Sequence, residues 1–132
     1  RFQRLAEWRL ALVPGIVSYD FLYTWQSDRL NWETNNIFWL EEPLHPDNIN
    51  GLSQLRKQSK IPIAAGEAYS GHGEYQSLLD QEAVDFLQFD ATFSGGILPC
   101  VKLAAEAKRR ALKSAVHVWG SAVAISSNAQ VA

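Results

Sequence analysis

Short runs of β-branched and aromatic residues recur along this chain and alternate with longer stretches of helical period. The runs predict strands, and the stretches between them predict helices. Such regular alternation favours consecutive right-handed βαβ units, which place the strands parallel in one sheet. Several runs are apolar at successive positions, as in Ile37-Phe38-Trp39-Leu40, which is typical of strands covered on both faces. We expect strands at Ile16–Asp20, Ile37–Glu41, Ile61–Glu67, Asp85–Asp90 and Ser114–Trp119.

The stretches between these runs carry helix signals of their own. Asp47 and Asn48 follow Pro46 and are both suitable N-caps for the stretch that begins there. The longest stretch has its basic residues in its last turns, where cations favour the helix dipole. The expected helices are Leu5–Leu12, Gln26–Asn36, Asn48–Ser59, Gly73–Gln81 and Gly96–Leu112, with the start of a sixth at Ala122–Ala132.

The number of strand–helix units bounds the architecture. A closed barrel of eight units needs about 250 residues, and the 132 residues here supply about five units. The sequence therefore predicts an α/β fold, a parallel (β/α) TIM-type barrel that is incomplete in this chain. Residues 1–132 are expected to form part of a single barrel domain, and the absence of methionine suggests a piece of a longer protein. An open doubly wound sheet of the flavodoxin or receiver kind is the alternative.

Composition excludes several classes of partner. The chain has 12 Lys and Arg against 14 Asp and Glu, a balance that argues against nucleic acid and anionic membranes as general partners. No apolar run approaches the roughly 18–20 residues of a membrane span. The single cysteine, Cys100, excludes an internal disulfide and fits a reducing compartment such as the cytoplasm.

Each expected strand ends with an acidic residue or carries a histidine near its end. These positions recur at intervals of 21 to 27 residues, and each interval is one strand–helix unit. Parallel strands bring their carboxyl ends to one face, where the catalytic residues of β/α barrels lie. An open sheet would separate some of them, because its strand order reverses at the switch point. We expect the following residues around one mouth: Asp20, Glu41, Glu67, Asp90 and His117.

Three of these carboxylates suit a metal ion. Unpaired carboxylates that converge repel one another and are costly to bury. A hard divalent cation removes that conflict, and Mg²⁺ prefers oxygen ligands. Asp20, Glu41 and Glu67 come from three consecutive strands and are the predicted ligands, with Glu42 directly beside them. Zinc is disfavoured because Cys100 is alone.

Asp90 and His117 form a second pair on the next two strands. A carboxylate that accepts a hydrogen bond from one imidazole nitrogen fixes the tautomer and raises the basicity of the other nitrogen. This is the arrangement of a general base. Taken singly, an acid at a strand end is commonly a helix N-cap, and His117 between Val116 and Val118 is as readily a core histidine. The catalytic interpretation depends on five such residues in register.

Four segments, in their order along the chain, resemble motifs of a known superfamily. They are Trp39-Leu40-Glu41-Glu42-Pro43-Leu44, Ile61-Pro62-Ile63-Ala64-Ala65-Gly66-Glu67, Phe86-Leu87-Gln88-Phe89-Asp90 with Ser94-Gly95-Gly96, and Val116-His117 with Gly120-Ser121. Together they resemble the enolase superfamily, specifically its mandelate racemase-like branch. The muconate lactonising branch carries a lysine on the strand of Asp90, and residues 85–96 contain none. The resemblance implies that an N-terminal capping domain and the first barrel strands precede this segment and are absent from it.

The resemblance also implies a chemistry. Mg²⁺, or Mn²⁺, bound by Asp20, Glu41 and Glu67 would stabilise an enediolate formed when the proton α to a carboxylate is removed. Asp90 and His117 would move that proton. The implied reaction is dehydration of a sugar acid or racemisation of a 2-hydroxy acid, by a cytoplasmic lyase or isomerase that forms homo-oligomers when complete. This segment alone is expected to be inactive. The alternative is a non-catalytic barrel remnant that acts in assembly or binding, because an open half-barrel exposes sheet edges.

Overall fold

The computed structural model of this chain describes residues 16–18 and 36–132. Within these residues the strands form one five-stranded parallel sheet in the order β1-β2-β3-β4-β5. The sheet follows the chain without reversal, as a (β/α) barrel requires, and the open doubly wound alternative is therefore wrong. The strands are β1 (Ile16–Ser18), β2 (Trp39–Glu41), β3 (Ile63–Ala65), β4 (Phe86–Phe89) and β5 (Lys113–Val116).

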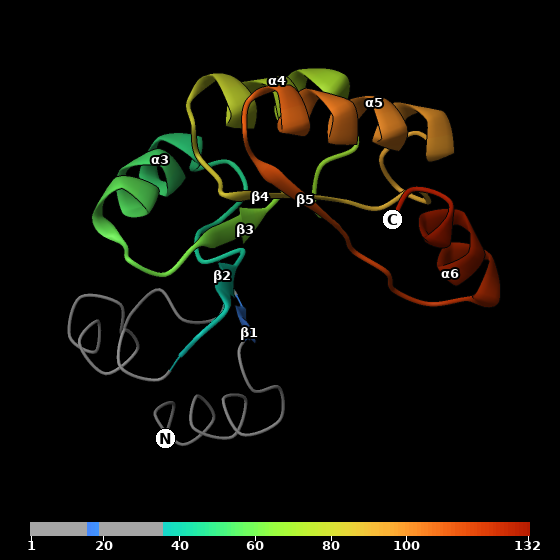
Figure 1. The fold of residues 1–132 in the computed structure, drawn as a ribbon, viewed down its shortest axis with the longest axis horizontal. Coiled ribbons are helices and arrows are strands. Elements are labelled where there is room, and N and C mark those ends of the chain that lie inside the picture. The colour runs from blue at the N-terminus through green and yellow to red at the C-terminus, as the bar shows by residue number, and fades with distance from the viewer. Residues whose placement is uncertain (1–15, 19–35) are drawn as a thin grey trace.

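A helix follows each of the strands β2 to β5. In Figure 1, three of these helices lie together along one side of the sheet, and the last lies apart from them beyond the end of β5. Asn48 is the N-cap of the first of these helices, and its side chain accepts a hydrogen bond from the Gly51 N–H. The helices are α3 (Ile49–Gln58), α4 (His72–Asp80), α5 (Ile97–Arg109) and α6 (Ala122–Ala129).

The elements are shorter than the sequence patterns suggest. The predicted strand Ser114–Trp119 is wrong at its end, because β5 stops at Val116 and Trp119 is 82 % exposed. The predicted helix Leu5–Leu12 lies outside the described residues, as does Gln26–Asn36 except for its last residue. The single-domain organisation of residues 1–132 stays a prediction for the same reason.

The hydrophobic core lies between the strands and the helices. Leu87 and Phe89 of β4 belong to this core, together with buried leucines of α3 and α4. Phe86 points to the opposite face, where its ring lies 4.9 Å from that of Trp39. Ala64 pairs with Phe86 in the sheet, and its small side chain leaves room for this contact across β3. Along β4, residues that face the helices and the core therefore alternate with residues that face the opposite side of the sheet.

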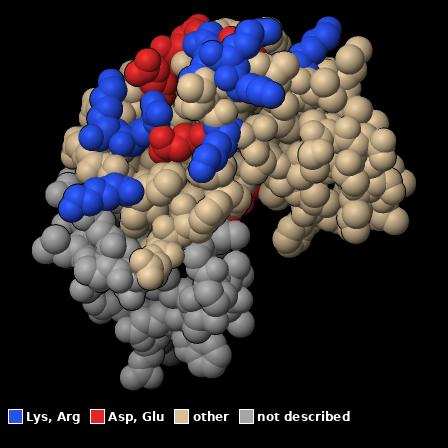
Figure 2. All heavy atoms as spheres, in the orientation of Figure 1, with Lys and Arg blue, Asp and Glu red and all other residues tan. Residues whose placement is uncertain are grey.

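Charged residues of both signs lie interspersed over the helices of the face shown in Figure 2. Arg56 pairs with Asp85, and Arg110 pairs with Asp80 and Glu106. The described residues include no helix long and apolar enough to cross a membrane.

Candidate functional site

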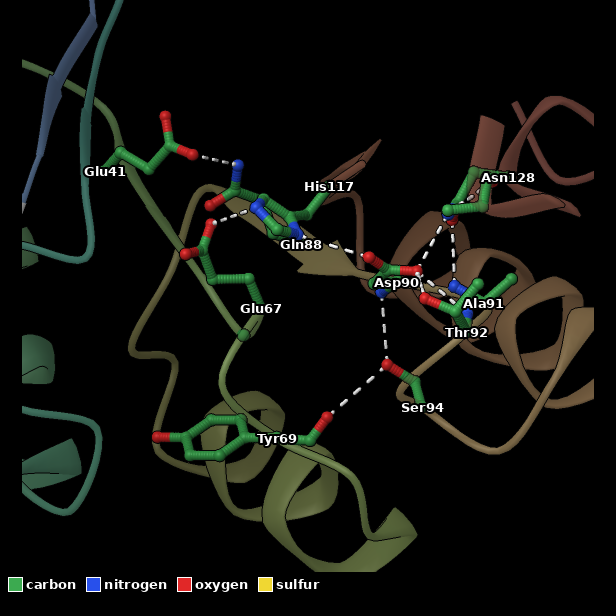
Figure 3. A network of polar contacts seen from close by, with 12 residues as sticks. Glu41, Glu67, Tyr69, Gln88, Asp90, Ala91, Thr92, Ser94, His117 and Asn128 are labelled. Carbon is green, nitrogen blue, oxygen red and sulfur yellow. Dashed lines mark hydrogen bonds and ion pairs between the residues drawn. The ribbon is translucent and has the colours of Figure 1, made fainter. Parts of the chain in front are cut away.

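Four of the five predicted site residues lie at the carboxyl end of the sheet (Figure 3). Glu41 is the last residue of β2, and Glu67 lies two residues beyond β3. Asp90 directly follows β4, and His117 directly follows β5. The fifth residue, Asp20, lies outside the described residues. Because the strands are parallel and follow chain order, side chains from four consecutive strand–helix units lie at the same end of the sheet.

His117 lies between two of the carboxylates. Its Nδ1 is 3.3 Å from Asp90 Oδ2, and its Nε2 is 3.6 Å from Glu67 Oε2. The His117 side chain is 25 % exposed, so the ring is held by the protein and still open to solvent on one side. The structure therefore brings the predicted pair Asp90 and His117 together and places Glu67 at the other nitrogen.

The two oxygens of Asp90 have different partners. Oδ1 accepts hydrogen bonds from the Thr92 N–H at 2.8 Å, the Thr92 hydroxyl at 2.6 Å and the Asn128 Nδ2 at 2.8 Å. Oδ2 faces His117. Burial raises the pKa of the Asp90 carboxyl, but these hydrogen bonds outweigh burial and hold the pKa below its ordinary value. Asp90 is therefore ionised at neutral pH.

Glu41 is held at both carboxylate oxygens. Gln88 Nε2 donates to Oε1 at 3.1 Å, and the Trp39 indole donates to Oε2 at 3.1 Å. Trp39 can do so because it lies two residues earlier on the same face of β2. Gln88 reaches from β4 across β3, where Ala64 and Gly66 present no large side chain.

The charge of Glu41 acts on the carboxyl group of Glu67. Burial raises the pKa of the Glu67 carboxyl, His117 opposes this, and the like charge of Glu41 raises it further. Two mutually repelling carboxylates form an all-oxygen donor set, which fits a hard cation such as Mg²⁺. No group of three convergent metal-ligating side chains occurs among the described residues. Glu41 and Glu67 are two of the three predicted ligands, and Asp20 is the third.

Glu42 follows Glu41 in the chain and bonds to the backbone next to Glu67. Its backbone has a φ of 42°, and its side chain is buried with Oε1 accepting from the Gly66 N–H at 2.7 Å. Its Oε2 has no hydrogen-bond partner among the described residues. Burial raises the pKa of Glu42 to about 7, with the Gly66 hydrogen bond opposing and the charges of Glu67 and Glu41 adding to the rise. Glu42 thus holds the backbone that leads into Glu67.

Three further residues of this site, Gln88, Thr92 and Asn128, were not predicted from the sequence. A signal existed for Gln88, because it is a polar residue two positions before Asp90 in an apolar run, and alternate strand positions share a face. Asn128 gave no such signal, since its contact with Asp90 depends on how α6 packs.

This chain is similar to known proteins in both sequence and structure. Residues 26–132 match the family model described as enolase C-terminal domain-like. A D-galactonate dehydratase family member from Salmonella virchow is 35% identical over 85 residues, which are 64% of this chain and 20% of that protein. L-talarate/galactarate dehydratase from Salmonella typhimurium is 39% identical over 85 residues, 64% of this chain and 21% of that protein.

Among the solved structures that are similar to this chain is a 3,6-anhydro-D-galactonate cycloisomerase from Zobellia galactanivorans. Its TM-score with this chain is 0.74 at 31% sequence identity, covering 78% of this chain and 29% of that one. The chain spans about a fifth of the length of the two dehydratase relatives.

Proposed function

This chain belongs to the enolase C-terminal domain-like family, and from that premise we propose that the protein removes the proton α to the carboxylate of a sugar acid. The observation that carries the proposal is the row of Asp90, His117 and Glu67, in which each imidazole nitrogen faces a carboxylate. The relatives are named as a D-galactonate dehydratase family member, an L-talarate/galactarate dehydratase and a 3,6-anhydro-D-galactonate cycloisomerase, and the two dehydratase names favour dehydration as the overall reaction.

The proton α to the carboxylate is difficult to remove. A proton α to a carboxylate is far too weakly acidic for an imidazole, unless the negative charge that develops on the substrate is stabilised. Mg²⁺, or Mn²⁺, held by Glu41 and Glu67 and by the predicted ligand Asp20, would supply that stabilisation as a Lewis acid.

His117 is the proposed base. Asp90 accepts from Nδ1, which leaves the lone pair on Nε2 to take the proton. Nε2 lies on the side of Glu67, so the base would meet the substrate beside the proposed ligands. In a dehydration, the protonated His117 would then give its proton to the departing β-hydroxyl, which leaves as water. In a racemisation, His117 would remove or deliver the proton on one face of the α-carbon only, and a group outside the described residues would serve the other face.

The test is exchange of the α-proton for deuterium, measured by NMR on galactonate, galactarate and related sugar acids with Mg²⁺. It uses the full-length protein, since this segment alone is expected to be inactive. His117→Asn and Asp90→Asn should each lower the exchange rate by about 10²–10⁴-fold. His72→Asn, an exposed histidine at the start of α4, is the matched control and should leave the rate unchanged.

Absence of exchange in the wild-type protein over the whole panel would overturn the proposal, as would a His117→Asn variant with the wild-type rate. The first result would favour the alternative of a non-catalytic barrel that acts in assembly or binding. A cytoplasmic location and a homo-oligomeric state remain predictions.

A further inference from the structure

A fully buried asparagine on α6 contacts the chain around Asp90. Asn128 has 0% of its surface exposed. Its Nδ2 donates to Asp90 Oδ1 at 2.8 Å and to the Ala124 carbonyl at 3.1 Å, and its Oδ1 accepts from the Ala91 N–H at 2.8 Å. A leucine of similar size would fill the same volume without requiring three hydrogen bonds. The amide is therefore there for its polar contacts rather than for its packing.

These contacts constrain the orientation of the Asp90 carboxylate. The other donors to Oδ1 are the backbone N–H and the hydroxyl of Thr92, which lies in the exposed turn that follows Asp90. Asn128 donates from a separate helix, 38 residues further along the chain. Because Oδ1 is held by these donors, Oδ2 stays directed at His117 Nδ1 (Figure 3).

We infer that Asn128, although fully buried, is a positioning residue for the Asp90–His117 pair, on which proton transfer depends. The inference rests on the proposed function for its kinetic consequence. Its structural consequence, the tautomer of His117, does not depend on any reaction.

Two variants separate the contacts of Asn128. Asn128→Leu removes both the donor and the acceptor at nearly constant volume. Asn128→Asp keeps an acceptor for the Ala91 N–H and replaces the amide that donates to Asp90 by a carboxylate, which repels the Asp90 carboxylate. Ser121→Ala is the matched control, since it removes the side chain that caps α6 at Ala124 N without touching Asp90.

The first measurement is α-deuterium exchange by the full-length protein. Both Asn128 variants should lower kcat by about 10- to 100-fold, because a misplaced base costs rate without weakening binding. KM should stay within about twofold, since Asn128 does not touch the substrate. Ser121→Ala should keep the wild-type kcat.

The second measurement needs no substrate. At a pH where the ring is neutral, the ¹⁵N NMR shifts of His117 should show a protonated Nδ1 in the wild type and a mixture of tautomers in both Asn128 variants. Wild-type kcat and a wild-type tautomer in the folded variants would overturn the inference, as would a Ser121→Ala variant that reproduces their effect. If the wild type shows no exchange, the proposed function fails, and the tautomer alone decides the inference.

Discussion

Gly66 occupies a position that a residue with a side chain cannot take without strain. Its φ is +125°, and an added Cβ would lie 2.3 Å from the Gln88 carbonyl oxygen. Its N–H donates to Glu42, and its carbonyl accepts from the Tyr75 hydroxyl at 2.8 Å. The backbone at Gly66 therefore joins β3 to β4, to α4 and to the residue that supports Glu67.

We expect Gly66→Ala to lower the free energy of unfolding by about 2–4 kcal/mol, since it combines a left-handed backbone with a clash against backbone. Urea titration followed by circular dichroism measures this. Gly73→Ala is the control, because a Cβ at Gly73 in α4 would meet nothing within 4 Å. Equal destabilisation by the two changes would contradict the structural argument.

Tyr75 predicts a dependence of stability on alkaline pH. Its side chain is 1% exposed, and its hydroxyl contacts the carbonyls of Gly66 and Tyr69 and the Ser94 hydroxyl. Burial raises the pKa of Tyr75, with the Ser94 hydrogen bond opposing it. Above a pH of about 10 the unfolded tyrosine ionises while the folded one stays protonated. The folded state then binds more protons, and stability falls as pH rises.

Tyr75→Phe should lose about 1–3 kcal/mol near pH 7, because buried partners lose their hydrogen bond. Its further loss between pH 9 and 11.5 should be smaller than that of the wild type. Tyr69, whose pKa burial also raises, accounts for part of the remaining dependence. Urea midpoints across this range provide the measurement, and parallel curves for the two proteins would refute the role given to Tyr75.

Four of the site residues that the structure describes could be predicted by a local rule, one acidic residue or histidine near the end of each strand. The residues that form hydrogen bonds with them could not be predicted. Thr92 contacts Asp90 because of the geometry of a turn, and Asn128 does so because of how α6 packs. Neither contact corresponds to a periodic pattern in the sequence. The catalytic and metal-binding roles of the site residues stay predictions.

At the scale of elements, Arg56 of α3 holds its helix to the segment that leads into β4. Its Nε donates to Asp85 Oδ1 at 2.8 Å and its guanidinium also donates to the Glu82 carbonyl. Asp85 Oδ2 accepts from the Ile63 N–H at 2.8 Å. One carboxylate thus serves the starts of β3 and β4 as well as α3.

Asp85→Ala should lower the free energy of unfolding by about 1–3 kcal/mol, because it removes the acceptor of the Ile63 N–H and of the Arg56 Nε. Arg56→Met should cost less, about 1 kcal/mol, since this pair is partly solvent-exposed. Asp80→Ala, which breaks an exposed pair with Arg110, should leave stability nearly unchanged and serves as the control. Chemical denaturation of the three variants would refute the argument if Asp80→Ala proved as costly as Asp85→Ala.

Helices were easier to predict than strands for a physical reason. Asn48 caps α3 as its residue type and position indicate. The expected strand Ile61–Glu67 extends past the end of β3 at Ala65, because Gly66 adopts a positive φ and leaves the extended conformation. Strand ends are therefore set by backbone conformation rather than by hydrophobicity.

At the scale of the whole molecule, a metal ion held by Glu41 and Glu67 should link binding to stability. At a hundredfold excess over its Kd, Mg²⁺ would stabilise the folded protein by about 2.7 kcal/mol. We expect EDTA to lower the Tm of the full-length protein by several degrees, and Mg²⁺ to restore it. Glu67→Gln should abolish this shift, whereas Glu82→Gln, at an exposed position away from the site, should retain it. A scanning calorimetry trace with the full shift in Glu67→Gln would argue against the site.

The parallel barrel architecture and the family resemblance are confirmed, because alternation of elements and motif order are properties of the whole sequence. The substrate itself stays a prediction, since no described residue identifies it.

The alternation along β4 restricts how this chain can change in length. Leu87 and Phe89 face the core, whereas Gln88 and the following Asp90 face the site. Deleting a single residue before Leu87 would turn each following side chain of β4 to the other face of the sheet. The polar groups would then be buried against the helices. Insertions and deletions should therefore survive only in the connecting loops, where a changed length reshapes the mouth of the barrel without moving the strands.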